Sequence, residues 1–299
     1  MKQNKTTASD NRNALTKPIK LSDVVGQEDA VQQLKEFIFS IENKHIANIW
    51  KVKPPKGLLL TGVPGTGKTM SVRALVNEIQ GDVILEELKF KDLESQWVGK
   101  SVKLLSTYFA KINAEAKKNH VIVFIDEIDA FLPVRDSKLH QSFSQRVTVF
   151  LEWMDGGIYP LENVTLIGTT NCLNNLDPAA KRPGRFDRII EFKPLNSEAI
   201  VDCFKVHLDL KQLEENQIGE IDWDRIKSAV ANVQLSGAAI PNILDRILIE
   251  KAIEHSNKIS ASTEKAKKIN PNDISFYPTP ISTEDLLSQI TIFLKSSQE

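Results

Sequence analysis

The sequence contains only two cysteines, Cys172 and Cys203, which stand far apart in its 299 residues. Neither belongs to a Cys-x-x-Cys pair, which disfavours a zinc site or a disulfide framework. We therefore expect reduced, packed thiols in a cytoplasmic protein. No apolar run approaches the roughly 18 residues that cross a bilayer, and no secretory hydrophobic region stands near the N-terminus. The sequence therefore predicts no membrane anchor.

An excess of charge of one sign is also missing. Lysine and arginine number 38 against 39 aspartates and glutamates, which gives a formal net charge of −1. Without a basic stripe, general electrostatic attraction to nucleic acid is disfavoured. The 41% of hydrophobic residues is ordinary for a soluble globular protein, and the length suits two domains.

The segment Gly62–Thr69 reads Gly-Val-Pro-Gly-Thr-Gly-Lys-Thr and matches the phosphate-loop pattern G-x-x-x-x-G-K-[ST]. Glycines let backbone N–H groups turn inward around a phosphate, and the next helix adds its positive dipole end. Lys68 is placed to reach the β- and γ-phosphates, and the Thr69 hydroxyl is placed to ligate Mg²⁺. The alternative is a glycine-rich turn with a surface lysine. The residues that we expect to contact the nucleotide here are Gly62, Val63, Pro64, Gly65, Thr66, Gly67, Lys68, Thr69 and Met70.

Helical segments alternate with short apolar strands over residues 21–195. Such alternation predicts a parallel sheet with helices on both faces, whose ligands bind at the carboxyl ends of the strands. The fold class is therefore α/β, of the phosphate-loop NTPase type. The expected strands are Gly57–Thr61, Val83–Leu88, Val121–Ile125, Val164–Gly168 and Arg188–Phe192.

After Pro194 the strand pattern stops, and helical periodicity predicts a small helical domain over residues 196–299. Within it, a polar stretch near 255–280 predicts a loop. Residues 1–20 have little to bury and predict a flexible leader. The expected helices are Ser197–Leu208, Asp222–Ala231, Ser236–Ile253 and Ser282–Leu294.

Two strands of the predicted sheet end in polar residues. Asp126 and Glu127 follow Val121–Ile125, where Asp126 can bind Mg²⁺ through its water shell and Glu127 can orient the attacking water. An acidic pair that merely caps a strand is the alternative. Asn171 follows the strand that begins at Val164 and can donate to the γ-phosphate or the water, although a lone asparagine there is more often a turn former. With the phosphate loop, these residues predict hydrolysis.

At this point the sequence resembles the AAA subgroup of the AAA+ ATPases, from about Leu21 to the C-terminus. The resemblance rests on Leu176–Arg188, with Asp126–Ala130 and Met154–Gly156 ahead of it. It implies ATP and Mg²⁺ as cofactors, an α/β ATPase domain followed by a helical lid, and a homo-oligomeric ring of six subunits.

Arginines are the next residues that the resemblance assigns. Arg182 and Arg185 would reach into the neighbouring subunit's site and offset charge on the transferring phosphoryl group. The alternative is that both form local surface ion pairs. The resemblance also places Asp23, Val25 and Gly26 against adenine, and Gly237 and Ala238 near the base. His207 would lie near the nucleoside or would simply be packed.

In this family an aromatic–aliphatic–glycine loop lines the central pore and grips a polypeptide, and Trp97, Val98 and Gly99 match it. A large flat side chain contacts almost any residue, although Trp97 could otherwise be a core tryptophan. No His-Glu-x-x-His protease motif and no recruitment domain before Leu21 is evident, so we expect a stand-alone motor that works with a separate adaptor or effector protein. The leading prediction is a ring that remodels, unfolds or threads proteins. The alternatives are an ATP-gated subunit that switches a partner enzyme and, less favoured, a nucleic-acid motor.

Overall fold

The structure is a computed structural model that describes residues 17–52, 55–81, 83–89, 100–134, 141–156, 162–233, 235–263 and 279–296. The chain divides into two compact units. The first spans Lys20–Pro194, and the second comprises Leu195–Glu299 together with Met1–Ile19, of which Lys17–Ile19 are described.

A five-stranded sheet forms the centre of the first unit. Its strand order is β2-β3-β4-β1-β5, and every pairing is parallel. Every residue of β3 and β4 is buried, which explains why these strands read as continuous apolar runs. The predicted α/β parallel sheet is confirmed. The strands are β1 (Gly57–Thr61), β2 (Val83–Glu87), β3 (His120–Ile125), β4 (Val164–Thr170) and β5 (Arg188–Glu191).

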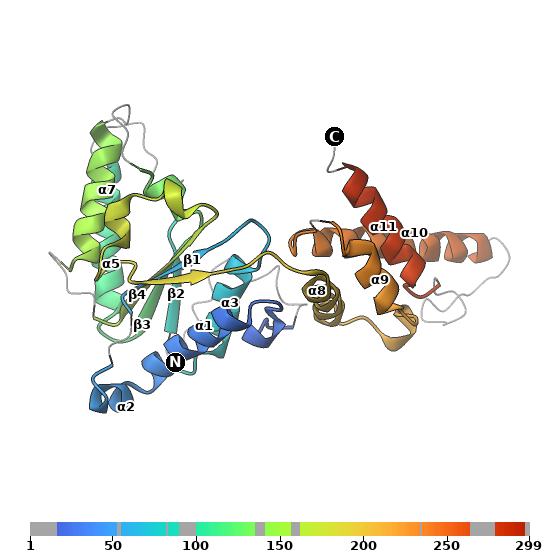
Figure 1. Cartoon of the computed structure of the whole chain (residues 1–299), viewed down its shortest axis with the longest axis horizontal. Coiled ribbons are helices and arrows are strands. Elements are labelled where there is room, and N and C mark those ends of the chain that lie inside the picture. The colour runs from blue at the N-terminus through green and yellow to red at the C-terminus, as the bar shows by residue number, and fades with distance from the viewer. Residues whose placement is uncertain are drawn as a thin grey trace. The chain divides into compact units, whose positions relative to one another are not determined.

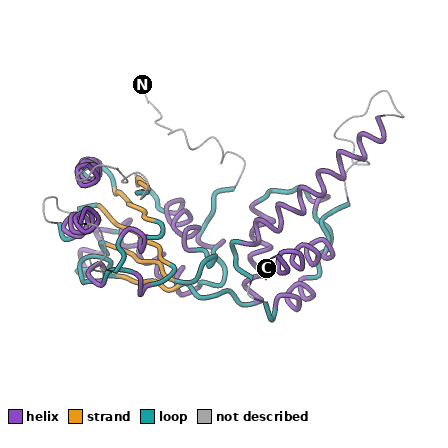
Figure 2. The backbone as a smooth tube through the Cα atoms, turned by 90° about the horizontal axis from the view of Figure 1, so that it is seen from above, coloured by secondary structure: helices purple, strands orange, loops and turns teal. Residues whose placement is uncertain are grey.

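Helices cover both faces of this sheet, with α1 and α3 on one side and α5 and α7 on the other (Figure 1). In Figure 2 the orange strands lie between these purple helices. The α5–α7 side is fixed by an aromatic cluster in which Phe109 stacks on Trp153 with ring centroids 3.9 Å apart. The helices are α1 (Glu28–Glu42), α2 (Lys44–Ile49), α3 (Lys68–Glu78), α5 (Lys100–Glu115), α6 (Ile128–Phe131) and α7 (Gln141–Met154), with short 3-10 helices η2 (Leu21–Asp23), η3 (Leu173–Asn175) and η4 (Pro178–Lys181).

The second unit is helical and packs around an apolar core that includes Phe204, Leu244 and Leu286. Its predicted helices are present, but the predicted loop near 255–280 is wrong at its start, because α10 continues to Thr263. Among the described residues, no helix is both long and apolar enough to span a membrane. The helices are α8 (Ser197–Leu210), α9 (Trp223–Val230), α10 (Ala239–Thr263) and α11 (Thr283–Ser296), with the 3-10 helix η5 (Glu215–Gln217).

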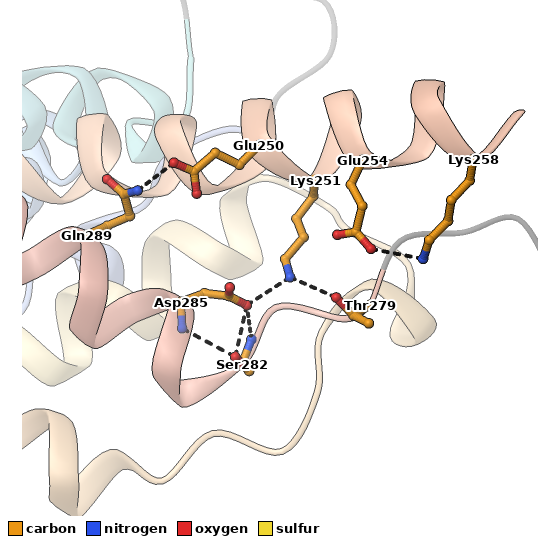
Figure 3. A network of polar contacts seen from close by, with 8 residues as sticks. All are labelled: Glu250, Lys251, Glu254, Lys258, Thr279, Ser282, Asp285 and Gln289. Carbon is orange, nitrogen blue, oxygen red and sulfur yellow. Dashed lines mark hydrogen bonds and ion pairs between the residues drawn. The ribbon is translucent and has the colours of Figure 1, made fainter. Parts of the chain in front are cut away.

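Polar contacts join the later turns of α10 to α11 (Figure 3). Lys251 Nζ lies 3.0 Å from Asp285 Oδ2, and Gln289 Nε2 donates to Glu250 Oε1 over 2.7 Å. Burial raises the pKa of Asp285, but hydrogen bonds from Ser282 and Lys251 outweigh it and the net pKa is lowered. These contacts lie within the predicted part of α10. Beyond its predicted end at Ile253, Lys258 Nζ pairs with Glu254 over 2.9 Å.

His120, the first residue of β3, gives the first unit a stability that depends on pH. Its Nε2 lies 3.1 Å from Thr165 Oγ1, and burial together with the Lys44 charge lowers its pKa to about 4. An unfolded histidine binds its proton near pH 6.5, so between these values the unfolded state takes up more protons and acid destabilises the fold. Unfolding by urea should show a loss of about 1.6 kcal/mol between pH 6.5 and pH 5 that His120→Gln removes. An unchanged slope in the variant would contradict this assignment.

Candidate functional site

The phosphate loop joins β1 to α3 and has the backbone that its glycines predict. Gly67 has φ +95°, and a Cβ on Gly62 would lie 2.2 Å from the Phe192 carbonyl oxygen. Thr66 Oγ1 donates to the Val63 carbonyl over 2.9 Å and closes the loop. No side chain caps the N-terminus of α3. The first N–H groups of this helix therefore remain available to an anion such as a phosphate.

Lys68, the first residue of α3, crosses this loop. Its Nζ donates to the Gly62 and Val63 carbonyls over 2.6 and 2.9 Å, and to Asn171 Oδ1 over 3.0 Å. The side chain is buried, and burial lowers the pKa of its ammonium group, although Asp126 raises it in part. The lysine of the loop and the asparagine after β4 are thus brought together.

Two oxygen donors lie beside the lysine. Thr69 Oγ1 lies 3.4 Å from Asp126 Oδ1 and 3.5 Å from its Oδ2. A hydroxyl and a carboxylate are the hard oxygen ligands that Mg²⁺ accepts together with water and nucleotide phosphates. The part of the chain that the structure describes has no cluster of three or more His, Cys, Asp or Glu that could bind a metal alone. The donor set therefore fits a Mg²⁺ ion shared with a nucleotide.

Glu127 follows directly, at the carboxyl end of β3. Its φ is +50°, a left-handed conformation that is unfavourable for a side chain of this type. The backbone N–H of Glu127 donates to Thr169 Oγ1 over 3.0 Å, and the residue is exposed. An exposed carboxylate beside a phosphate loop can contact the attacking water. Thr169 is not among the residues that the sequence predicted for the site. Its position could have indicated a role, because it is a polar residue in an apolar strand, two positions before Asn171.

The two arginines differ in their contacts. Arg185 Nε and Nη2 donate to the two carboxylate oxygens of Asp155 over 2.7 Å each, and Nη1 donates to the Ala179 carbonyl over 2.6 Å. This hydrogen bonding by Arg185 lowers the pKa of the Asp155 carboxyl. Arg182 is exposed, and within the described ranges its guanidinium makes no hydrogen bond. The alternative that the sequence allowed, a local ion pair, is therefore present for Arg185.

A hollow of about 520 Å³ lies at these arginines. Arg182 and Arg185 line it together with Asp177 and Glu152, and none of the phosphate-loop residues does. Among the described residues, this hollow is thus separate from the phosphate loop. This separation is compatible with a role at a neighbouring molecule.

The remaining predicted residues fall into three groups. The segment Asp23–Gly26 lies beside the phosphate loop, since a Cβ on Gly67 would be 3.6 Å from Val24 Cγ1. His207, Gly237 and Ala238 belong to the second unit, where burial lowers the pKa of His207. Trp97, Val98 and Gly99 lie outside the described residues. Contacts of these groups with a nucleotide or a substrate stay predictions.

A parallel sheet with this loop after β1, an acidic pair after β3 and an asparagine after β4 defines a phosphate-loop NTPase. Residues 58–194, which include all but the first residue of the sheet, match the AAA family, described as ATPases associated with various cellular activities. These residues form a domain of the AAA family of ATPases.

Several curated proteins are similar to this chain. The human ATPase family AAA domain-containing protein 2 is 37% identical over 235 residues, which cover 74% of this chain and 16% of that protein. The cell division cycle protein 48 homologue of Archaeoglobus fulgidus is 35% identical over 199 residues, covering 66% of this chain and 26% of that protein. Tat-binding homolog 7 of Caenorhabditis elegans is 38% identical over 191 residues, which cover 62% of this chain and 14% of that protein. The aligned region thus makes up only a small part of each relative.

Proposed function

We propose that this chain binds Mg²⁺ and ATP at the phosphate loop and hydrolyses the γ-phosphate bond. The observation that carries the proposal is the convergence of Lys68, Thr69 and Asp126 with Asn171 and Glu127 at one edge of the sheet. Lys68 and the N–H groups of α3 bind the β- and γ-phosphates. A Mg²⁺ ion held by Thr69 and Asp126 would neutralise charge on the phosphate oxygens. Glu127 orients the attacking water and accepts its proton.

The contacts of Lys68 suggest how Asn171 responds to the nucleotide. The ammonium group now donates to two carbonyls of its own loop and to Asn171. A γ-phosphate is a stronger acceptor for this charged donor than neutral oxygens are. When Lys68 turns to the phosphate, the Asn171 amide is released to contact the phosphate or the water. Asn171 then reports whether the γ-phosphate is present.

We further propose that the site is completed by a neighbouring copy in a homo-oligomeric ring of six. Arg182 and Arg185 would supply guanidinium groups to the next subunit's phosphates, as heterologous contacts in a closed ring allow. The AAA family domain and the separate hollow at the arginines support this. Arg185 would first exchange its bidentate pair with Asp155 for the phosphoryl oxygens.

The output of the ring is proposed to be remodelling, unfolding or threading of a protein substrate, recruited with a separate adaptor or effector. The support is the sequence Trp97-Val98-Gly99, which matches the pore-loop pattern of the family, and the AAA family match. The alternative is a subunit whose ATP state switches a partner enzyme without threading. A nucleic-acid substrate is disfavoured by the net charge of −1. A cytoplasmic location stays a prediction from the two free cysteines.

Trp97→Ala separates threading from switching. If the Trp97 side chain contacts the substrate, the variant should keep its ATPase rate but lose unfolding of a fluorescent test protein that carries an unstructured tail. Trp50→Ala is the matched control, because Trp50 is 77% exposed and lies on another segment. Retention of unfolding by both variants would contradict threading and favour the switch.

A further inference from the structure

Thr169 is a buried residue of β4 that no nucleotide motif includes. We propose that it is a positioning residue whose hydroxyl sets the geometry of Asp126 and Glu127, an inference that rests on the proposed ATPase function. Its place follows from the register of the sheet, in which Ile125 of β3 pairs with Gly168 of β4. Thr169 therefore stands level with Asp126, directly after β3. With 2% of its surface exposed, it is held by the surrounding core.

The Thr169 hydroxyl makes two hydrogen bonds to this acidic pair. Its Oγ1 donates a short hydrogen bond to Asp126 Oδ1 and accepts from the Glu127 backbone N–H over 3.0 Å. A hydroxyl has one proton to donate, and here that proton is used on the carboxylate that faces Thr69. The single oxygen thus fixes both the orientation of the Asp126 carboxylate and the start of the turn that presents Glu127.

This turn needs such an anchor because Glu127 adopts φ +50°. A left-handed residue other than glycine persists only where its surroundings hold it in place. The hydrogen bond from its N–H to a side chain on a fully buried strand provides that constraint. Without it, the Glu127 carboxylate would sample directions that do not face the attacking water.

The position of β4 also links the two halves of the site. This strand lies between β3, which precedes the acidic pair, and β1, which precedes the phosphate loop. Thr169 lies on β4, and Asn171 is the first residue after this strand. Asn171 contacts Lys68 while Thr169 contacts Asp126. A shift of β4 with the state of the γ-phosphate would thus move Asp126 and Glu127 together.

Thr169→Val and Thr169→Ser test this role, because valine keeps the branched shape without the hydroxyl and serine keeps the hydroxyl. Groups that orient the ligands of a metal typically change its affinity or the activity by about 10–100-fold when removed. We expect Thr169→Val to lower kcat by about this factor and to raise the Mg²⁺ midpoint, with a KM for ATP near the parent value. Thr169→Ser should stay near the parent in all three.

The second readout is binding without turnover. The affinity for a non-hydrolysable ATP analogue is measured with Mg²⁺ and with EDTA. Thr169→Val should lose much of the increase in affinity that Mg²⁺ gives the parent protein. Thr165→Val is the matched control, since Thr165 is also buried on β4 and bonded, but to His120 at the other end. Its thermal unfolding midpoint should fall as that of Thr169→Val does, while its Mg²⁺ dependence stays unchanged.

Three results would overturn the proposal. They are parent-like kcat and Mg²⁺ midpoint in Thr169→Val, an equal loss in Thr169→Ser, or the same Mg²⁺ defect in Thr165→Val. A parent protein whose ATPase rate does not depend on Glu127 would instead contradict the proposed function. The analogue measurement would then still decide whether Thr169 positions Asp126.

Discussion

Replacing Glu127 with glutamine is expected to slow ATP hydrolysis by about 10²–10⁴-fold, because an amide of the same shape cannot accept the proton of the attacking water. ATP binding should persist, since Lys68 and the phosphate loop are untouched. The turn should also persist, because its hydrogen bond to Thr169 comes from the Glu127 backbone. Single-turnover hydrolysis and ATP affinity are measured on the same preparation.

Glu87→Gln is the control for this experiment. Glu87 is also an exposed glutamate at the carboxyl end of a strand, β2, next to β3. Its side chain pairs with Lys89 at 3.4 Å. The Glu87→Gln substitution should leave the rate of ATP hydrolysis unchanged. A Glu127→Gln protein that hydrolyses ATP as fast as the parent would contradict the role of Glu127 in activating water.

Replacing Arg185 with alanine is expected to lower kcat by about 10³-fold or more, since a guanidinium supplied in trans is worth 10³–10⁵ in such reactions. ATP binding by each chain should change little, because among the described residues Arg185 bonds to Asp155 and the Ala179 carbonyl and not to the phosphate loop. Arg188→Ala is the matched control. Arg188 stands three residues further along and pairs with Glu36 at 3.4 Å. Steady-state ATPase rates of the two variants are compared.

Because Arg185 also makes a local pair, a structural role has to be separated from a catalytic one. Asp155→Asn weakens the same pair while it leaves the guanidinium in place. If Arg185 acts on a neighbour's phosphate, Asp155→Asn should retain most of the activity that Arg185→Ala loses. Equal losses in the two variants would show that the ion pair supports the fold and that the arginine does not act in trans.

The parts of the site that the sequence predicted are those set by local patterns. The phosphate loop is contiguous, and its glycines adopt the positive φ values that the motif requires. The strands before Asp126 and Asn171 are buried on both faces, so each appears as an apolar run that ends in polar residues. Since the carboxyl ends of parallel strands meet at one edge, the sequence sufficed to predict that Lys68, Asp126 and Asn171 would lie close together.

Features that depend on distant residues were not predictable in the same way. The link from Thr169 to Asp126 requires the register of β3 against β4, which no local pattern fixes. The Arg185–Asp155 pair joins residues 30 positions apart. Helix α10 extends past its predicted end because polar surface residues such as Glu254 and Lys258 pair along it at 2.9 Å. From composition alone, such a segment is predicted to be a loop.

Mixing two inactive variants measures most directly whether the ATPase site is shared between subunits. Chains with Glu127→Gln and chains with Arg185→Ala are combined in equal amounts, and ATP hydrolysis is recorded. In a randomly mixed ring, about a quarter of the sites have an intact Glu127 beside a neighbour's intact Arg185. Our account predicts that activity returns toward about a quarter of the parent rate. A mixture as inactive as its two components would contradict it.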